Sequence, residues 1–302
     1  METIVAKIER LKKEKDAVIL AHYYVNDDIQ AIADYVGDSY YLSKIAVEVP
    51  QQVIVFCGVT FMGESAKILN PDKTVIMPEV LADCPMAHMA SVEKIKAVRA
   101  KQDDLAVVCY INSTAEIKKY VDVCVTSSNA LKIITALPQK NIYFVPDENL
   151  GRYLASMIPE KNFIFNDGFC HVHDEIMIDE VEAAKAAHPK AKVLVHPECT
   201  MNVINVADYV GSTSGIIDFA TDSDAQEFII GTEIGVLYQL QKKNPDKKFY
   251  PANAAQVCPN MKKITLEKVT FALDRMINQM EIDEETRLLS VQSLERMLEL
   301  SK

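Results

Sequence analysis

The most constraining feature of this sequence is a pattern that recurs three times along the chain. In each copy an apolar run leads to a polar residue, a hydroxyl-bearing residue follows seventeen positions later, and a cysteine lies 60 or 62 positions after the polar residue. The polar residues are His22, Tyr110 and His196, the hydroxyl residues are Ser39, Ser127 and Thr213, and the cysteines are Cys84, Cys170 and Cys258. A repeated spacing of this kind is stronger evidence for the fold than any local pattern. It predicts three repeat units, residues 1–87, 88–173 and 174–302, the last with a C-terminal helical tail.

Within each predicted unit, short β-type runs alternate with segments of helical period. The strands expected in the first unit are Val18–Ala21, Gln52–Phe56 and Thr74–Met77. A helix between the first two strands is expected to end at Gly37. The alternation predicts an α/β fold of three pseudosymmetric α/β/α units, each with a parallel sheet, around a central site. Because sites in such sheets form at the carboxyl ends of strands, His22, Tyr110 and His196 are expected there.

The composition excludes several classes of function. A net charge of −11 and a pI near 5.1 argue against bulk binding to nucleic acid or to an anionic membrane. No apolar run approaches the roughly 18 residues of a membrane-spanning helix. The first 15 residues are charged throughout and lack the apolar core of a signal peptide, so a cytoplasmic location is expected. Seven cysteines in such a chain favour metal binding or catalysis over structural disulfides.

The three cysteines at matched repeat positions suit a metal better than a disulfide. A [4Fe–4S] cluster on three thiolates leaves one iron open, and that iron can act as a Lewis acid. Zinc bound by three cysteines and one of His88, His171 or His173 is the alternative metal, and ordinary buried cysteines are the alternative without metal. The remaining cysteines have no matched positions. Cys57, Cys109 and Cys124 are expected in the core, and Cys199 in a loop near the site.

Further polar residues recur beside the strand ends. Tyr24, Asn112 and Glu198 lie two positions after the three strand-end residues, and Tyr24 and Glu198 are candidate proton-transfer groups. The hydroxyl residues of the repeat each follow a capping-type residue at an expected helix start, where backbone N–H groups favour anions. The alternatives are simple packing for Tyr24, a solvated loop carboxylate for Glu198 and plain helix caps for the three hydroxyl residues. No glycine-rich phosphate loop is present, so a nucleotide cofactor is not indicated.

These residues resemble the quinolinate synthase family, over most of the chain from Ala21 to Lys262. The motifs that carry the resemblance are Ala21-His22-Tyr23-Tyr24, Gly37-Asp38-Ser39, Asn70-Pro71-Asp72-Lys73, Cys84-Pro85-Met86, Tyr110-Ile111-Asn112-Ser113, His196-Pro197-Glu198-Cys199, Asp208-Tyr209-Val210-Gly211-Ser212-Thr213, Gly231-Thr232-Glu233 and Cys258-Pro259-Asn260-Met261-Lys262. Two departures are visible. Cys258 stands alone where some members have a Cys-x-x-Cys-x-x-Cys run, and His171 follows Cys170 where many have proline.

The resemblance implies a [4Fe–4S] cluster on Cys84, Cys170 and Cys258. It implies an enzyme of NAD biosynthesis that condenses iminosuccinate with dihydroxyacetone phosphate to quinolinate, with loss of phosphate and two waters. The candidate supplier of iminosuccinate is an L-aspartate oxidase or dehydrogenase. The catalytic residues that it implies are Tyr24, Glu198, His22 and His196. The substrate-binding residues that it implies are His22, Ser39, Tyr110, Asn112, Ser127, His173, His196, Glu198 and Thr213. The alternative function is a non-catalytic iron–sulfur or zinc protein whose metal is structural.

Overall fold

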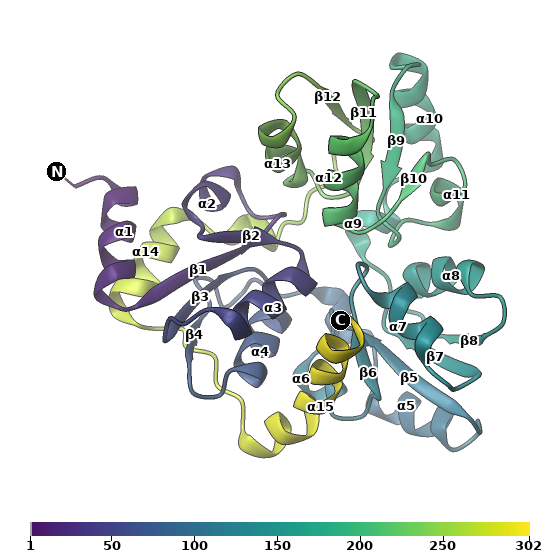
Figure 1. Cartoon of the computed structure of the whole chain (residues 1–302), viewed down its shortest axis with the longest axis horizontal. Helices are drawn as coiled ribbons and strands as arrows, with labels where there is room; N and C mark the ends of the chain where they lie inside the picture. The colour runs from purple at the N-terminus through teal and green to yellow at the C-terminus, as the bar shows by residue number, and fades with distance from the viewer. Residues whose placement is uncertain (1) are drawn as a thin grey trace. The chain divides into compact units, whose positions relative to one another are not determined.

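Three four-stranded parallel sheets form the framework of the computed structural model, which describes residues 2–302 (Figure 1). The strands of the first sheet are β1 (Ala17–His22), β2 (Tyr35–Gly37), β3 (Val53–Cys57) and β4 (Thr74–Ile76). Those of the second are β5 (Leu105–Tyr110), β6 (Val123–Val125), β7 (Asn141–Val145) and β8 (Asn162–Phe165). Those of the third are β9 (Lys192–Val195), β10 (Tyr209–Val210), β11 (Glu227–Gly231) and β12 (Lys248–Pro251). The predicted α/β fold with three parallel sheets is confirmed.

All three sheets have the same strand order. It is β2-β1-β3-β4 in the first, β6-β5-β7-β8 in the second and β10-β9-β11-β12 in the third. The central strands are mostly apolar; all six residues of β1 and all five of β3 are buried. Burial of both faces is typical of parallel sheets covered by helices.

Helices connect and cover the strands. The helices before the second sheet are α1 (Ile4–Glu14), α2 (Asp27–Ile32), α3 (Ser39–Glu48), α4 (Thr60–Leu69), η1 (Pro85–His88) and α5 (Val92–Arg99). Those that follow, up to the third sheet, are α6 (Ala115–Lys118), α7 (Ala130–Ala136), α8 (Glu148–Met157), α9 (His171–Asp174) and α10 (Ile178–Ala187). The remaining helices are α11 (Met201–Ile204), α12 (Thr213–Asp222), α13 (Val236–Lys243), η2 (Met261–Lys263), α14 (Leu266–Arg275) and α15 (Glu284–Leu300). Within residues 2–302, none of the helices has both the length and the apolar character needed to cross a bilayer.

The expectation that a helix runs to Gly37 is wrong. Helix α2 ends at Ile32, and Tyr35–Gly37 instead forms strand β2. The reason is Asp34, whose carboxylate accepts from the Ile19 N–H at 2.8 Å while its own N–H donates to the Ile19 carbonyl at 3.0 Å. This double contact fixes the chain against the edge of β1, so that the residues after Asp34 extend the sheet.

The same device recurs in the third sheet. Asp208 accepts from the Val193 N–H at 2.8 Å, and its own N–H donates to the Val193 carbonyl at 2.8 Å. Strand β10 then pairs with β9. Two repeats therefore use an aspartate to start the edge strand.

Residue contacts divide the chain into two compact units, each described here by itself. The first comprises Met1–His88, Ile111–Cys124 and Pro259–Lys302, and the second comprises Met89–Tyr110 and Val125–Cys258. In the first unit α1 packs on α14, and α15 packs on α4 and α6. The second unit contains the whole third sheet. The repeat boundaries predicted above stay a prediction.

Equivalent strands carry the polar residues of the repeat. Strands β1, β5 and β9 hold the same place in their sheets. His22 is the last residue of β1, Tyr110 is the last residue of β5, and His196 directly follows β9. The three residues therefore lie at the carboxyl ends of equivalent strands, as expected.

Candidate functional site

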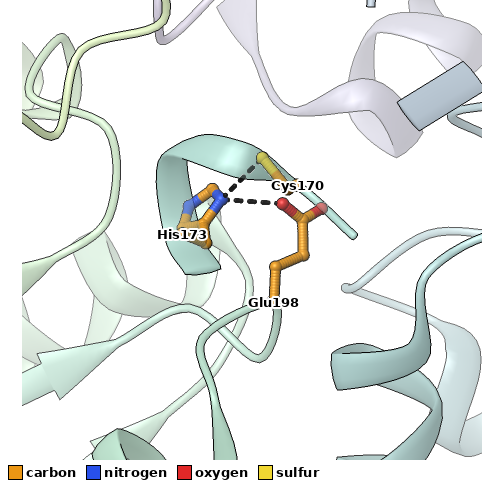
Figure 2. A group of neighbouring side chains, drawn as sticks. All are labelled: Cys170, His173 and Glu198. Carbon is orange, nitrogen blue, oxygen red and sulfur yellow. Dashed lines mark hydrogen bonds and ion pairs between the residues drawn. The ribbon is translucent and has the colours of Figure 1, made fainter. Parts of the chain in front are cut away.

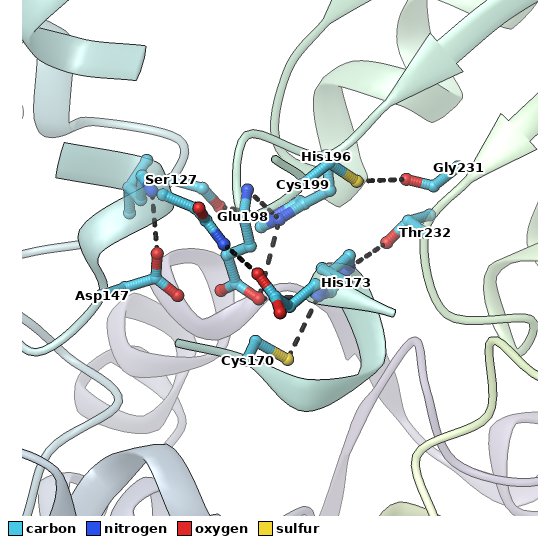
Figure 3. Close-up of polar contacts among 12 residues, drawn as sticks. Ser127, Asp147, Cys170, His173, His196, Glu198, Cys199, Gly231 and Thr232 are labelled. Carbon is cyan, nitrogen blue, oxygen red and sulfur yellow. Dashed lines mark hydrogen bonds and ion pairs between the residues drawn. The ribbon is translucent and has the colours of Figure 1, made fainter. Parts of the chain in front are cut away.

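A buried carboxylate, Glu198, is the centre of a polar network in the second unit (Figure 3). Its side chain is only 3% exposed, which excludes the solvated loop carboxylate considered above. The Tyr110 hydroxyl donates a short hydrogen bond to Oε1, and His173 Nδ1 lies 2.7 Å from Oε2. Both oxygens of the carboxylate are thus paired with groups that carry exchangeable protons.

His173 connects this carboxylate to a cysteine. Figure 2 shows its ring directed at both the Cys170 sulfur and the Glu198 carboxylate, with Nδ1 3.2 Å from Sγ. The other ring nitrogen, Nε2, lies 2.8 Å from the Thr232 hydroxyl. One donor atom each from Cys170, His173 and Glu198 lie within 4.8 Å of one another. Thiolate, imidazole and carboxylate at this spacing are able to hold a metal ion.

The tautomer of His196 follows from its hydrogen bonds. Its Nδ1 accepts from the Glu198 N–H at 3.3 Å, so the proton of the neutral ring resides on Nε2. That N–H donates to the Ser127 hydroxyl at 3.1 Å. The first unit repeats the arrangement, because the Tyr24 N–H donates to His22 Nδ1 at 3.2 Å. Both histidines therefore present an N–H donor at Nε2, which suits an anionic ligand.

Two buried carboxyl groups have opposite pKa shifts. Burial by itself would raise the pKa of Glu198, but His173 and His196, with hydrogen bonds from His173 and Tyr110, hold it below its usual range. Burial and the neighbouring charge of Glu198 raise the pKa of Asp147 well above its usual range. Glu198 is consequently ionised at neutral pH.

The seven cysteines separate into two groups by burial. Cys84, Cys170 and Cys258 are half-buried, whereas Cys57, Cys109, Cys124 and Cys199 are buried. Burial raises the thiol pKa of Cys57 and of Cys199, and the Cys199 sulfur contacts the Gly231 carbonyl at 3.4 Å. Thiolates are the form that binds metal. Half-burial therefore distinguishes the three cysteines that the repeat selects from the other four.

The first unit carries several of the residues named from the sequence. The Tyr24 ring packs edge-on against the His22 ring, with centroids 4.5 Å apart, and the Tyr24 carbonyl accepts from Lys262 Nζ at 2.7 Å. Cys84 follows Asp83, whose carboxylate accepts from the Cys84 N–H at 2.8 Å. Its other oxygen lies 2.7 Å from Nε2 of His88.

Asn112, also in the first unit, has a buried side-chain oxygen. This oxygen has no hydrogen-bond partner within residues 2–302. A buried polar atom without a partner is costly unless a ligand satisfies it. Asn112 is therefore suited to receive a donor group.

The hydroxyl residues of the repeat are not all at helix starts. Ser39 and Thr213 are the first residues of α3 and α12, which Asp38 and Ser212 cap. Ser127 differs, because α7 begins three residues later, at Ala130. The expectation of a helix start at Ser127 is thus wrong, and its hydroxyl instead contacts His196.

Two fully buried acids, Asp147 and Glu233, were given no role from the sequence, although Glu233 belongs to the motif Gly231-Thr232-Glu233. Asp147 follows β7 by two positions, and Glu233 follows β11 by two positions. Both lie at carboxyl ends of parallel strands, where the rule applied to His22 would also have found them.

Comparison with known proteins gives one consistent result. A family model described as quinolinate synthetase A protein matches residues 6–299. A relative from Caldicellulosiruptor saccharolyticus is 52% identical over 301 residues, which cover 100% of this chain and 99% of the relative. One from Fusobacterium nucleatum is 52% identical over 295 residues and covers 98% of each chain. One from Thermodesulfovibrio yellowstonii is 48% identical over 296 residues, again 98% of each. All three relatives are called quinolinate synthase.

Proposed function

This chain belongs to the quinolinate synthase family, and we propose that it condenses iminosuccinate with dihydroxyacetone phosphate to quinolinate, releasing phosphate and two waters. The observation that carries the proposal is the buried Glu198 carboxylate, paired on one side with Tyr110 and on the other with His173 beside Cys170. A condensation with two dehydrations needs several proton transfers, and this network places an ionised base between two groups that exchange protons. The reaction is assigned to the cytoplasm, with an L-aspartate oxidase or dehydrogenase as supplier of iminosuccinate.

The cofactor of the proposal is a [4Fe–4S] cluster. Cys84, Cys170 and Cys258 would hold it, and their half-burial, in contrast with the four buried cysteines, supports this choice. When bound, such a cluster with three thiolates supplies an open iron that polarises a hydroxyl or carbonyl oxygen.

The remaining roles concern proton transfer and substrate binding. Glu198 takes part in the proton transfers through its contacts with Tyr110 and His173. Tyr24, at the equivalent place in the first unit, is the second proton-transfer residue.

Substrate anions require donors of fixed direction. The Nε2 N–H of His22 provides one, because Nδ1 of that ring is occupied by a backbone N–H. The Ser127 hydroxyl provides another, because it accepts from His196 Nε2 and is left to donate its own proton. The starts of α3 and α12, at Ser39 and Thr213, add backbone N–H groups for carboxylate or phosphate. Asn112, Ser127 and His173 complete the proposed binding set.

A second candidate function rests on a specific observation. Cys170, His173 and Glu198 are close enough to supply three of the four ligands of one zinc ion. In that case the metal would be structural zinc, and the chain would bind it without catalysis.

One experiment separates the two candidates. The protein is purified under strict anaerobiosis, its iron, sulfide and zinc contents are measured, and quinolinate is quantified after addition of dihydroxyacetone phosphate and freshly generated iminosuccinate. We expect about four irons and four sulfides per chain, the composition of one [4Fe–4S] cluster, together with quinolinate formation. Zinc in place of iron, without product, would overturn the proposal.

A further inference from the structure

The Glu233 carboxylate contacts the backbone of a proposed cluster ligand. Glu233 is fully buried, and its Oε1 accepts from the Cys258 N–H at 3.0 Å. Its Oε2 accepts from the Gly235 N–H at 2.6 Å. Both oxygens therefore accept from backbone N–H groups. The Cys258 N–H lies 25 residues further along the chain, and the Gly235 N–H lies in the same turn as Glu233.

A neighbouring side chain reinforces this attachment. Gln256, two residues before Cys258, donates from Nε2 to the Ile230 carbonyl at 2.8 Å and to the Thr232 carbonyl. The Gln256 carbonyl in turn accepts from the Ile234 N–H at 3.0 Å. The loop that carries Cys258 is thus attached to the end of β11 through both the side chain and the backbone carbonyl of Gln256.

The second sheet has an equivalent arrangement. Asp147 lies in the turn after β7, the strand that corresponds to β11, and its Oδ1 accepts from the Leu150 N–H at 2.7 Å. The Glu148 N–H donates to the Gly168 carbonyl at 2.7 Å, two residues before the cysteine.

In the first sheet, a threonine in place of an acidic residue holds the cysteine loop. Thr60 follows β3, and both its N–H and its hydroxyl donate to the Ala82 carbonyl, at 2.9 and 3.1 Å. Ala82 precedes Cys84 by two residues. In all three repeats, the turn after the corresponding strand holds the cysteine loop.

We propose that Glu233 is a positioning residue that fixes the backbone of Cys258 for cluster binding, and that the turns of Asp147 and Thr60 do the same for Cys170 and Cys84. The inference rests on the cluster of the proposed function. Glu233 is not a catalytic residue, because it is fully buried and both of its oxygens accept from backbone N–H groups. Partners that orient metal ligands typically change metal affinity by about 10- to 100-fold when they are removed.

The test variant is Glu233→Gln, which keeps the size of the side chain. Its amide group directs an N–H at one of the two backbone donors, so one of the two hydrogen bonds is lost. The matched control is Glu227→Gln, at the start of β11, the strand that precedes Glu233. It removes a half-buried carboxylate that pairs with Lys248 instead of a cysteine loop. Both variants are compared with wild type for the rate of iron loss to a chelator, the midpoint potential of the cluster and the unfolding temperature of the apo-protein.

Three results are expected. E233Q loses iron about tenfold or more faster than wild type. Its cluster potential shifts from the wild-type value, because the carboxyl group beside the ligand is replaced by an amide. E227Q matches wild type in both measurements. A role confined to stability would lower only the unfolding temperature of apo-E233Q, and that result would overturn the inference.

A failure of the proposed function and a failure of the positioning role of Glu233 would give different results. A wild-type protein without any cluster contradicts the proposed function, whereas a wild-type cluster that E233Q retains equally well contradicts the role of Glu233. Should E233Q not fold, Glu233→Asp replaces it, since aspartate keeps the charge and shortens the reach. Faster iron loss with an unchanged potential is then expected, and a wild-type rate of loss would refute the positioning role.

Discussion

The Nδ1 atom of His173 lies 2.7 Å from Glu198 Oε2, and the same atom is 3.2 Å from the Cys170 sulfur. A proton on Nδ1 is therefore placed between a carboxylate and a thiol. In the neutral ring Nε2 then accepts from the Thr232 hydroxyl, 2.8 Å away. The proposed base and a proposed cluster ligand are in this way linked through one imidazole, so a change at Glu198 is expected to alter the hydrogen bond to Cys170 but to leave its thiolate in place.

Replacement of Glu198 by glutamine should abolish most of the activity. Glutamine keeps the volume but cannot accept a proton, so kcat is expected to fall by about 10²- to 10⁴-fold, the range for a general acid–base group. Iron content should stay at the wild-type level, because the proposed cluster ligands are unchanged. Steady-state quinolinate formation and iron analysis on the same sample check both statements. A kcat close to wild type would contradict the assignment of Glu198 as the base.

Removal of the Ser127 hydroxyl should weaken the binding of a dicarboxylate substrate analogue. In Ser127→Ala the Nε2 N–H of His196 loses its acceptor, and the ligand loses a hydrogen-bond donor. Loss of a hydrogen bond to a charged group costs roughly 1–2 kcal/mol, or about 5- to 30-fold in Kd. Calorimetric titration measures this change, with Ser128→Ala, an exposed neighbour, as the control. Equal affinities for the two variants would remove Ser127 from the binding set.

The pairing of Glu79 with Lys268 should make stability depend on pH. The hydrogen bond from Lys268, followed by that from the Leu81 N–H, lowers the pKa of Glu79 from its ordinary value of 4.5. A carboxyl with a lowered pKa in the folded chain stabilises it above the unfolded pKa, and this contribution is lost as the pH falls through the folded pKa.

Glu79→Gln should therefore reduce the free energy of unfolding by about 0.5–1 kcal/mol at pH 7, since Lys268 is partly exposed. The difference from wild type should shrink as the pH is lowered below 4.5. Urea denaturation across this range measures it, with Lys268→Met in a double-mutant cycle as the control. A difference that is constant with pH would show that the effect does not come from the carboxylate charge.

The fold was largely predictable because the apolar runs that form its central strands can be recognised locally in the sequence. Runs such as Val53–Cys57 are apolar and bounded by polar or turn residues, and they became buried strands. The edge strand β2 was not predictable in this way. Tyr35–Gly37 extends the sheet because Asp34 bonds to Ile19, fifteen residues earlier, and no local pattern records that contact.

The candidate site was predictable only where the repeat marks it. The positions of Tyr110 and His196 at strand ends followed from spacing, but their joint approach to Glu198 and Ser127 depends on tertiary packing. Glu233 was named in the motif Gly231-Thr232-Glu233 but given no role, because its partner is a backbone N–H far along the chain, and a backbone group has no sequence signature.

The three cysteines of the repeat are expected to be required for iron binding. Serine replacement of Cys84, Cys170 or Cys258 should each remove most of the iron, because a thiolate ligand is replaced by a weakly acidic hydroxyl. Cys199→Ser is the matched control: Cys199 is buried, its sulfur contacts the Gly231 carbonyl, and burial raises its thiol pKa, so it is a poor ligand. This variant should retain wild-type iron content and sulfide content.

A dicarboxylate analogue should then perturb the EPR spectrum of the reduced cluster in wild type and in Cys199→Ser alike. The reason is that three thiolates leave one iron open for substrate, whereas a fourth protein ligand would close it. Two outcomes would contradict this assignment. Iron loss in Cys199→Ser as large as in Cys258→Ser would mean that the buried thiol is a ligand. An EPR spectrum unchanged by saturating analogue would mean that no iron is open to substrate, and the metal would then serve structure and not catalysis.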